Sequence, residues 1–222
     1  KELLDACLDQ VAEQTGGLMG GALMRQAFIF VTSPGNVTPF HSDPELNFLL
    51  QVRGQKRMSL FDHRDRMVVS AENSELYPGK HRNLPYREKF EARADQQHIA
   101  PGEGIFVPIF APHWVQNGSE VSVSFSITWH TVESQRLVKL SYVNAMLRKL
   151  GMPQADAGER PLWDGVKVAA YDALRPVYDG LKRLVGDRRL PSHRSERRRG
   201  HRGRKAGRRG RGDGGLLGPR DQ

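Results

Sequence analysis

The amino-acid sequence predicts a mainly β domain, a sandwich or a barrel, with helices before and after it. Between Gln26 and His130 the chain consists of short apolar runs separated by Gly, Pro, Asn and Asp, the residues that favour turns. The last run alternates, with apolar residues at odd positions from Val121 to Ile127 and serine or threonine at even positions from Ser122 to Thr128. Such a strand has two different faces. Many short strands joined by turns are typical of sandwiches and barrels.

A short helix is expected ahead of the strands. Apolar residues recur at helical spacing within residues 2–14, and Gly16 with Gly17 ends the pattern. The chain has one cysteine, Cys7, which excludes an internal disulfide and a zinc site built from cysteines. Its place on the apolar stripe predicts a thiol packed in the core.

Seven runs are predicted as strands: AFIFVT, NFLLQVRG, KRMSLF, QQHIA, GIFVPI, HWVQN and VSVSFSITW. In a small barrel one face of each strand lines the interior, so the serine face of the last run could form a polar lumen. The sequence leaves open which face is inside. The polar stretch from Ser70 to Ala94 is interpreted as a long insertion, either a substrate-contacting loop or a plain surface loop.

Two amphipathic helices are expected after Thr131. The first carries apolar residues from Leu137 to Leu150 and is ended by Gly151 and Pro153. The second covers 163–185, where Pro176 is expected to kink or split it. These helices either cap the barrel or form a homodimer interface.

Four regions are therefore expected: an N-terminal helical flank at 1–25, the β core at 26–132, the C-terminal helices at 133–186, and a disordered Arg/Gly-rich tail at 187–222. The tail holds twelve Arg and one Lys against four acids, a formal charge of +9 that equals the charge of the whole chain. Residues 1–186 are thus neutral overall. A tail of this composition cannot bury enough surface to order itself, and it binds nucleic acid non-specifically or is a solvated extension without a role.

A cytoplasmic location without membrane contact is expected. No window of the sequence approaches the roughly eighteen apolar residues that a membrane-spanning helix needs. No signal peptide is visible either.

The motif that points to chemistry is His41-Ser42-Asp43. Two histidines and one carboxylate on one face leave metal positions open, the arrangement used by non-haem Fe(II) oxygenases. The third ligand must come from a further histidine. His113 has the best context, because it follows a turn, an apolar strand and two prolines that restrict its approach. The other candidates lie in polar loops, on predicted strands or in the tail: His63, His81, His98, His130, His193 and His201.

Two segments, together about half of the chain, resemble the JmjC and cupin-like Fe(II)- and 2-oxoglutarate-dependent oxygenases. GNVTPFHSDPELNFLLQVRGQKRMSLF, residues 35–61, resembles the metal-binding segment of that family. PGEGIFVPIFAPHWVQNGSEVSVSFSITW, residues 101–129, resembles its later strands and third ligand. Within the family the chain is similar to the asparaginyl hydroxylases that act on hypoxia-inducible factor and to bacterial cupin-like domain proteins. The resemblance implies a double-stranded β-helix, that is, a jelly-roll or cupin core.

The resemblance also implies a site. His41, Asp43 and His113 match the iron ligands of the family. Lys56 matches the lysine that pairs with the distal carboxylate of 2-oxoglutarate, and Thr38 matches a hydroxyl that hydrogen-bonds to the same carboxylate. The remaining co-substrate positions are an amide, an Asn-or-Ser position and an apolar wall, matched by Asn47, Ser126 and Phe30. The tyrosine that the family often supplies from an earlier strand has no match in this sequence.

These matches predict an oxygenase that uses Fe(II), 2-oxoglutarate and O₂ to hydroxylate a protein or peptide side chain. No catalytic residue is expected beyond the metal ligands, because iron and the co-substrate carry the chemistry. A small-molecule substrate is the alternative within this class. A cupin with an isomerase, hydrolase or ligand-sensing role is a second class, but it would have no need of Lys56 and Thr38. A third class, a nucleic-acid-binding protein with an inert barrel, is opposed by the complete ligand set.

Overall fold

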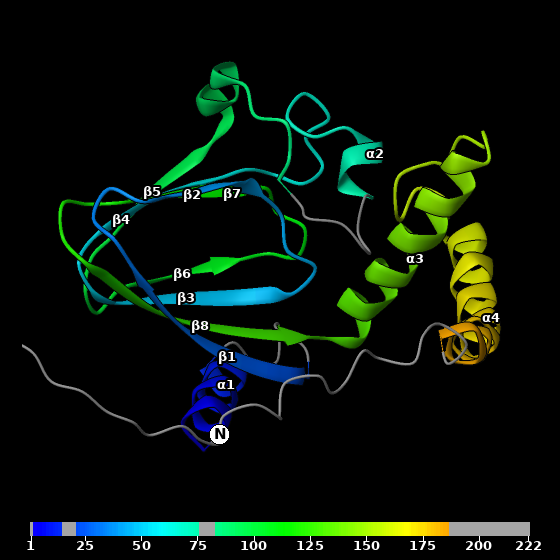
Figure 1. The fold of residues 1–222 in the computed structure, drawn as a ribbon, viewed down its shortest axis with the longest axis horizontal. Coiled ribbons are helices and arrows are strands. Elements are labelled where there is room, and N and C mark those ends of the chain that lie inside the picture. The colour runs from blue at the N-terminus through cyan, green and yellow to red at the C-terminus, as the bar shows by residue number, and fades with distance from the viewer. Residues whose placement is uncertain (1, 15–20, 76–82, 187–222) are drawn as a thin grey trace, which may run out of the picture. The chain divides into compact units, whose positions relative to one another are not determined.

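The computed structural model describes residues 2–14, 21–75 and 83–186 (Figure 1). The chain divides into one compact unit, residues 1–179, and a second unit, residues 180–222, of which only 180–186 are described. The tail that was predicted to be disordered and basic lies outside the described residues. Residues 76–82 of the predicted insertion Ser70–Ala94, which include His81, lie outside them as well.

Two four-stranded antiparallel sheets form the core of the first unit. One sheet has the order β1-β8-β3-β6 and the other β2-β7-β4-β5. Their strands are β1 (Leu23–Thr32), β2 (Val37–His41), β3 (Leu46–Arg53), β4 (Lys56–Leu60), β5 (Asp95–Ile99), β6 (Gly104–Val107), β7 (His113–Asn117) and β8 (Ser122–His130). Two facing sheets with this strand order confirm the jelly-roll core. The strand that the apolar runs did not predict is β2, which carries His41.

The serine face of β8 is the inner face. Ser122, Ser124 and Ser126 are buried. Gln51 on β3 links two of them, because its Nε2 donates to Ser122 Oγ at 2.9 Å and its Oε1 accepts from Ser124 Oγ at 2.8 Å. These pairings satisfy polar groups that would be costly to bury alone. The interior between the sheets is therefore partly polar, as the alternation allowed.

The apolar face of β8 packs on the outside of the sheet against helix α1 (Glu2–Gln14). Leu4 and Leu8 of that helix form a cluster with Ile127 and Trp129 of β8. Cys7 lies at the edge of the same cluster and is half-buried. The helix thus covers an apolar sheet face that would otherwise meet water.

The connection between β4 and β5 covers the outer face of the second sheet. It holds the short helix α2 (Ala71–Ser74) and the 3₁₀ helix η1 (Glu88–Arg93). Its apolar side chains form a core cluster with β2: Phe40, Phe61, Val68, Val69, Leu84 and Phe90. The insertion therefore packs directly behind the strand that carries His41.

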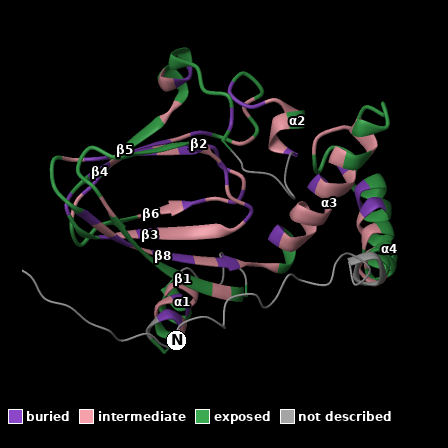
Figure 2. Ribbon diagram, in the orientation of Figure 1, coloured by how far each residue is buried: buried purple, intermediate pink, exposed green. Residues whose placement is uncertain are grey.

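Two helices follow β8: α3 (Val132–Lys149) and α4 (Pro161–Gly186). Thr131 starts α3 with a capping box, in which its hydroxyl accepts from Ser134 N and Ser134 Oγ accepts from Thr131 N. Helix α4 continues through Pro176, so the expected split does not occur. Figure 2 shows α4 as largely exposed, and its apolar residues up to Tyr178 remain in contact with solvent, so a homodimer interface there stays a prediction.

No helix in the described ranges is long and apolar enough to cross a membrane.

Candidate metal centre

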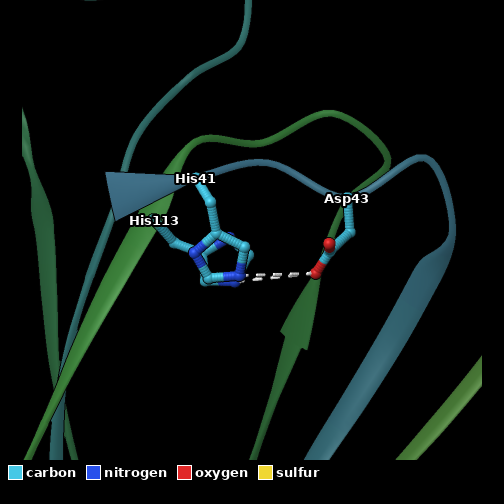
Figure 3. A group of neighbouring side chains, drawn as sticks. All are labelled: His41, Asp43 and His113. Atoms are coloured by element: carbon cyan, nitrogen blue, oxygen red, sulfur yellow. Dashed lines mark ion pairs between the residues drawn. The ribbon is translucent and has the colours of Figure 1, made fainter. Parts of the chain in front are cut away.

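Three side chains that the sequence singled out meet at one point (Figure 3). His41 ends β2, His113 begins β7, and the two residues are paired across these strands, with ring centroids 4.2 Å apart. Asp43 follows in the turn after β2. Its Oδ2 lies 3.7 Å from His41 Nε2 and 3.9 Å from His113 Nε2. In the described part of the chain this is the one group of three or more His, Cys, Asp or Glu side chains that could hold a metal ion.

The backbone determines which ring nitrogen of each histidine faces the site. Nδ1 of His41 lies 2.7 Å from the carbonyl oxygen of Pro39, and Nδ1 of His113 lies 2.9 Å from that of Ala111. A carbonyl only accepts, so each Nδ1 carries a proton, and Nε2 is the ring nitrogen of each histidine that can bind a metal. Both Nε2 atoms are the ones directed at Asp43. The site therefore presents the Nε2 atoms of two imidazoles and one carboxylate.

Burial keeps His113 in the form that binds a metal. Its side chain is buried at the start of β7, and this desolvation, together with the neighbouring His41, lowers the pKa of His113 to about 4. The imidazole is thus neutral at neutral pH, as metal ligation requires. Two imidazole ligands and a carboxylate suit a divalent first-row metal such as Fe(II).

A bulge in β2 brings Thr38 to the same side as His41. In a regular strand, residues three apart point to opposite faces. The β2–β7 register shifts between the pair Thr38–Val115 and the pair His41–His113, and this irregularity places both β2 side chains on one cavity. Phe40, between them, points to the other side and packs in the cluster under the insertion.

All eight site residues that the sequence proposed line one cavity of about 390 Å³ between the two sheets. The first sheet contributes Phe30 on β1, Asn47 on β3 and Ser126 on β8, whereas the second contributes Thr38, His41, Lys56 and His113, and Asp43 lies in the turn. Ser126 Oγ donates to Asn47 Oδ1 at 2.8 Å, so this bond uses the amide oxygen of Asn47 and not its amide nitrogen. The roles of these residues in binding remain predictions.

Lys56 is the cation of this cavity. Its residue is 7% exposed, and burial lowers the pKa of its ammonium group. Within the described ranges no carboxylate makes an ion pair with it, whereas the other buried lysine, Lys167, lies 3.8 Å from Asp164. A buried cation facing a cavity without a counter-ion favours an anionic ligand.

Sequence reasoning missed other residues that line the same cavity. They are Gln26, Phe28, Thr32, Glu45, Leu49, Met58, Val115 and Thr128. Most of them lie two positions from a proposed residue on the same strand. Residues two apart on a strand share a face, so this rule would have found them from the proposed residues Phe30, Asn47, Lys56, His113 and Ser126. Trp114, beside His113, is not part of this lining and packs on the opposite face of β7.

The chain is similar to a known protein family and to known proteins. The family model of the cupin-like domain matches residues 6–135, which include all eight strands and the three candidate ligands. Lysine-specific demethylase 8 of Danio rerio is 33% identical over 103 residues, covering 43% of this chain and 25% of that protein. The protein of the same name from Xenopus tropicalis is 29% identical over 109 residues, covering 43% and 23%. The chain thus spans about a quarter of the length of these curated relatives.

Among solved structures, the DMSP lyase DddQ of Ruegeria pomeroyi DSS-3 is similar with a TM-score of 0.31 and 15% identity, over 49% of this chain and 40% of that one. A cupin superfamily protein of Desulfitobacterium hafniense has a TM-score of 0.31 and 12% identity, over 47% and 66%.

Proposed function

The chain belongs to the JmjC/cupin-like family, and from that premise we propose that it is an Fe(II)- and 2-oxoglutarate-dependent oxygenase that hydroxylates a protein or peptide side chain. The single observation that carries the proposal is the buried residue Lys56 on the cavity that His41, Asp43 and His113 also line. A metal site alone would fit many cupins. A metal site fits an oxygenase that binds a dicarboxylate beside its metal when the same cavity has a buried lysine that pairs with no carboxylate in the described ranges.

The strand register supports this arrangement. On β4 and β7, Leu60 pairs with His113, whereas Lys56 pairs with Asn117, four residues along the strand. That offset corresponds to roughly 13 Å, of which an extended lysine side chain spans about half. Thr38 pairs with Val115, between those two levels. A five-carbon dicarboxylate would therefore place one carboxylate at Lys56 and Thr38 and its 2-oxo acid at the metal.

Each part of the cavity has a task in this proposal. His41, Asp43 and His113 would hold Fe(II), which together with 2-oxoglutarate supplies the activation of O₂ that oxidises a C–H bond. Lys56 and Thr38 would bind and orient the distal carboxylate. Leu49 and Met58 line the same cavity and exclude water from the methylene groups between the two ends. No side chain is required to move a proton.

A peptide substrate is supported by the form of the cavity wall. Phe28 and Phe30 on β1 are 45% and 44% exposed, although both line the cavity. The wall that they form is thus accessible from solvent, as the entry of a side chain carried by a larger molecule requires. The curated relatives are named for a demethylase specific for lysine, a residue of proteins, and this agrees with a protein substrate.

Succinate formation from 2-oxoglutarate tests the reaction class. Anaerobically purified protein receives Fe(II), ascorbate and air, beside His41→Ala and the control His98→Ala, which removes an exposed histidine of β5 outside this cavity. We expect succinate from wild type and from His98→Ala and none from His41→Ala. If wild type forms no succinate, and its Mn(II) form binds no 2-oxoglutarate at about millimolar concentration, the oxygenase proposal is wrong and a cupin of another activity replaces it.

A further inference from the structure

The strand that carries His41 lies at the edge of its sheet and is irregular. β2 is an edge strand of the order β2-β7-β4-β5, and its pairing with β7 is interrupted immediately before His41. An edge strand with a bulge has one row of backbone groups unpaired and a locally disrupted ladder on the other side. The position of His41 relative to His113 therefore needs support from outside the sheet.

That support comes from the segment that follows the undescribed residues 76–82. Asn83 forms a β-bridge with His41, and Leu84 N donates to the carbonyl oxygen of Phe40 at 2.8 Å. In the described ranges, this is the backbone pairing on the free edge of β2. Two residues further on, Tyr86 stacks edge-on against Phe40 with ring centroids 5.6 Å apart. Asn83–Tyr86 is called the β2 support segment below.

One carboxylate ties this support segment to the sheet. Glu91 Oε1 accepts from Tyr86 Oη at 2.8 Å and from Trp114 Nε1 at 2.5 Å. Its Oε2 accepts from Ser59 Oγ at 3.0 Å and from Gln96 Nε2 at 2.8 Å. Burial would raise the pKa of Glu91, but these hydrogen bonds outweigh it and the pKa is lowered, so the group is an anion at neutral pH.

Three of the four donors to Glu91 lie on adjacent strands of one sheet. Trp114, Ser59 and Gln96 are cross-strand neighbours on β7, β4 and β5, because Ser59 pairs with Trp114 on one side and with Gln96 on the other. The carboxylate of Glu91 thus bridges three adjacent strands on the face opposite the cavity. Trp114 is the residue next to His113, so the same group contacts the strand of one histidine and, through Tyr86, the support of the other.

We propose that Glu91 is a positioning residue of the metal centre, which holds the β2 support segment against β7 and so sets the spacing of His41 and His113. The proposal rests on the proposed function, because it assumes that the His41–Asp43–His113 group binds a metal. None of the four hydrogen-bond partners of Glu91 lines the cavity, and Glu91 takes no part in the chemistry.

The replacement Glu91→Gln tests this with little change in shape. Glutamine offers one acceptor oxygen where the carboxylate offers two, and its amide nitrogen would face donors. Glu88→Gln is the matched control, since Glu88 is an exposed glutamate of the same 3₁₀ helix, η1. Tyr86→Phe is a milder second variant, which removes one of the four hydrogen bonds and keeps the ring on Phe40.

The probe is Co(II), titrated into the metal-free full chain and followed by its visible absorption bands. We expect Glu91→Gln to raise the Kd for Co(II) about tenfold, the lower end of the effect of groups that act behind the ligands, and to shift the bands. Amide hydrogen exchange at Leu84 should become faster. Tyr86→Phe should change both readouts less and in the same direction, and Glu88→Gln should match wild type.

Unchanged Kd and bands in a folded Glu91→Gln protein would overturn the proposal, because a residue needed only for folding leaves the bands as they are. If Glu91→Gln does not fold, Tyr86→Phe decides, and wild-type Co(II) binding in that variant overturns the proposal as well. Failure of the wild-type protein to bind Co(II) would overturn the metal centre itself, and Glu91's role with it. The two failures are thus told apart by the wild-type titration.

Discussion

Replacing Lys56 with methionine should abolish tight binding of 2-oxoglutarate and leave both the fold and the metal site intact. Methionine has a similar length and keeps the apolar part of the side chain, so the shape of the cavity lining, which includes Met58 and Leu49, changes little. Lys56 makes no ion pair within the described residues, so its replacement leaves no carboxylate among those residues unpaired. Only the charge that faces the cavity is lost.

The expected loss of affinity for 2-oxoglutarate follows from the burial of Lys56. Truncating one partner of a buried, hydrogen-bonded charge pair costs about 2–5 kcal/mol of binding free energy. At about 1.4 kcal/mol per tenfold, this raises the Kd for 2-oxoglutarate by at least about thirtyfold. The free energy of unfolding of the metal-free protein should stay equal or increase, because the variant no longer desolvates an ammonium group on folding.

Isothermal titration of 2-oxoglutarate into the Mn(II) form, without O₂, measures the first effect, and urea denaturation of the metal-free protein measures the second. Lys56→Arg serves as the control that keeps the charge. A Lys56→Met protein that binds 2-oxoglutarate as tightly as wild type would refute the role of the buried cation. Loss of Mn(II) binding in this variant would refute the claim that metal and co-substrate contacts are separate.

Three further outcomes are expected. Burial lowers the pKa of Lys56 below its usual 10.5, and binding of 2-oxoglutarate needs the protonated ammonium. The affinity for 2-oxoglutarate should therefore be full well below the folded-state pKa and be lost as the pH rises through it. In the same titration Lys56→Arg should keep its affinity to higher pH. Leu8→Ala should lower the free energy of unfolding by about 2–5 kcal/mol in urea denaturation, because Leu8 is buried against Trp129, and an unchanged midpoint would contradict the packing of α1 on β8. Gly54→Ala should lower the free energy of unfolding by about 1–3 kcal/mol, since Gly54 has φ +70° and a Cβ there would lie 2.9 Å from the carbonyl oxygen of Val121. Gly102 has φ +90° but nothing within 4 Å of a Cβ, so Gly102→Ala in the same urea denaturation separates backbone strain from the close contact.

Backbone carbonyl oxygens orient the two histidine rings of the site. Both histidines are oriented by carbonyl oxygens two residues before them, Pro39 O for His41 and Ala111 O for His113. Carbonyl oxygens are present whatever the side chain, so this orientation depends on the backbone course. Proline at 39 and at 112 restricts that course in both segments.

Local patterns in the sequence determined the strands and the members of the site. Alternation predicted β8 with its polar face, and seven apolar runs correspond to seven of the eight strands. His41, Asp43 and His113 could be proposed because a His-x-Asp motif and a proline-framed histidine are short-range signals. Lys56 and Thr38 needed the family resemblance, since a lone lysine or threonine carries no pattern of its own.

Only the tertiary structure decided which face of each strand is inside and what holds the site from behind. β2 escaped prediction because it is short, contains Pro39 and is bulged, so the period-two pattern is broken where it carries His41. Glu91 gave no signal at all, because its four donors are spread over β7, β4, β5 and the support segment, and become neighbours only when the second sheet forms. The periodicity of a segment predicts its own secondary structure and its apolar face. Contacts between strands that are distant in sequence depend instead on the register of the whole sheet.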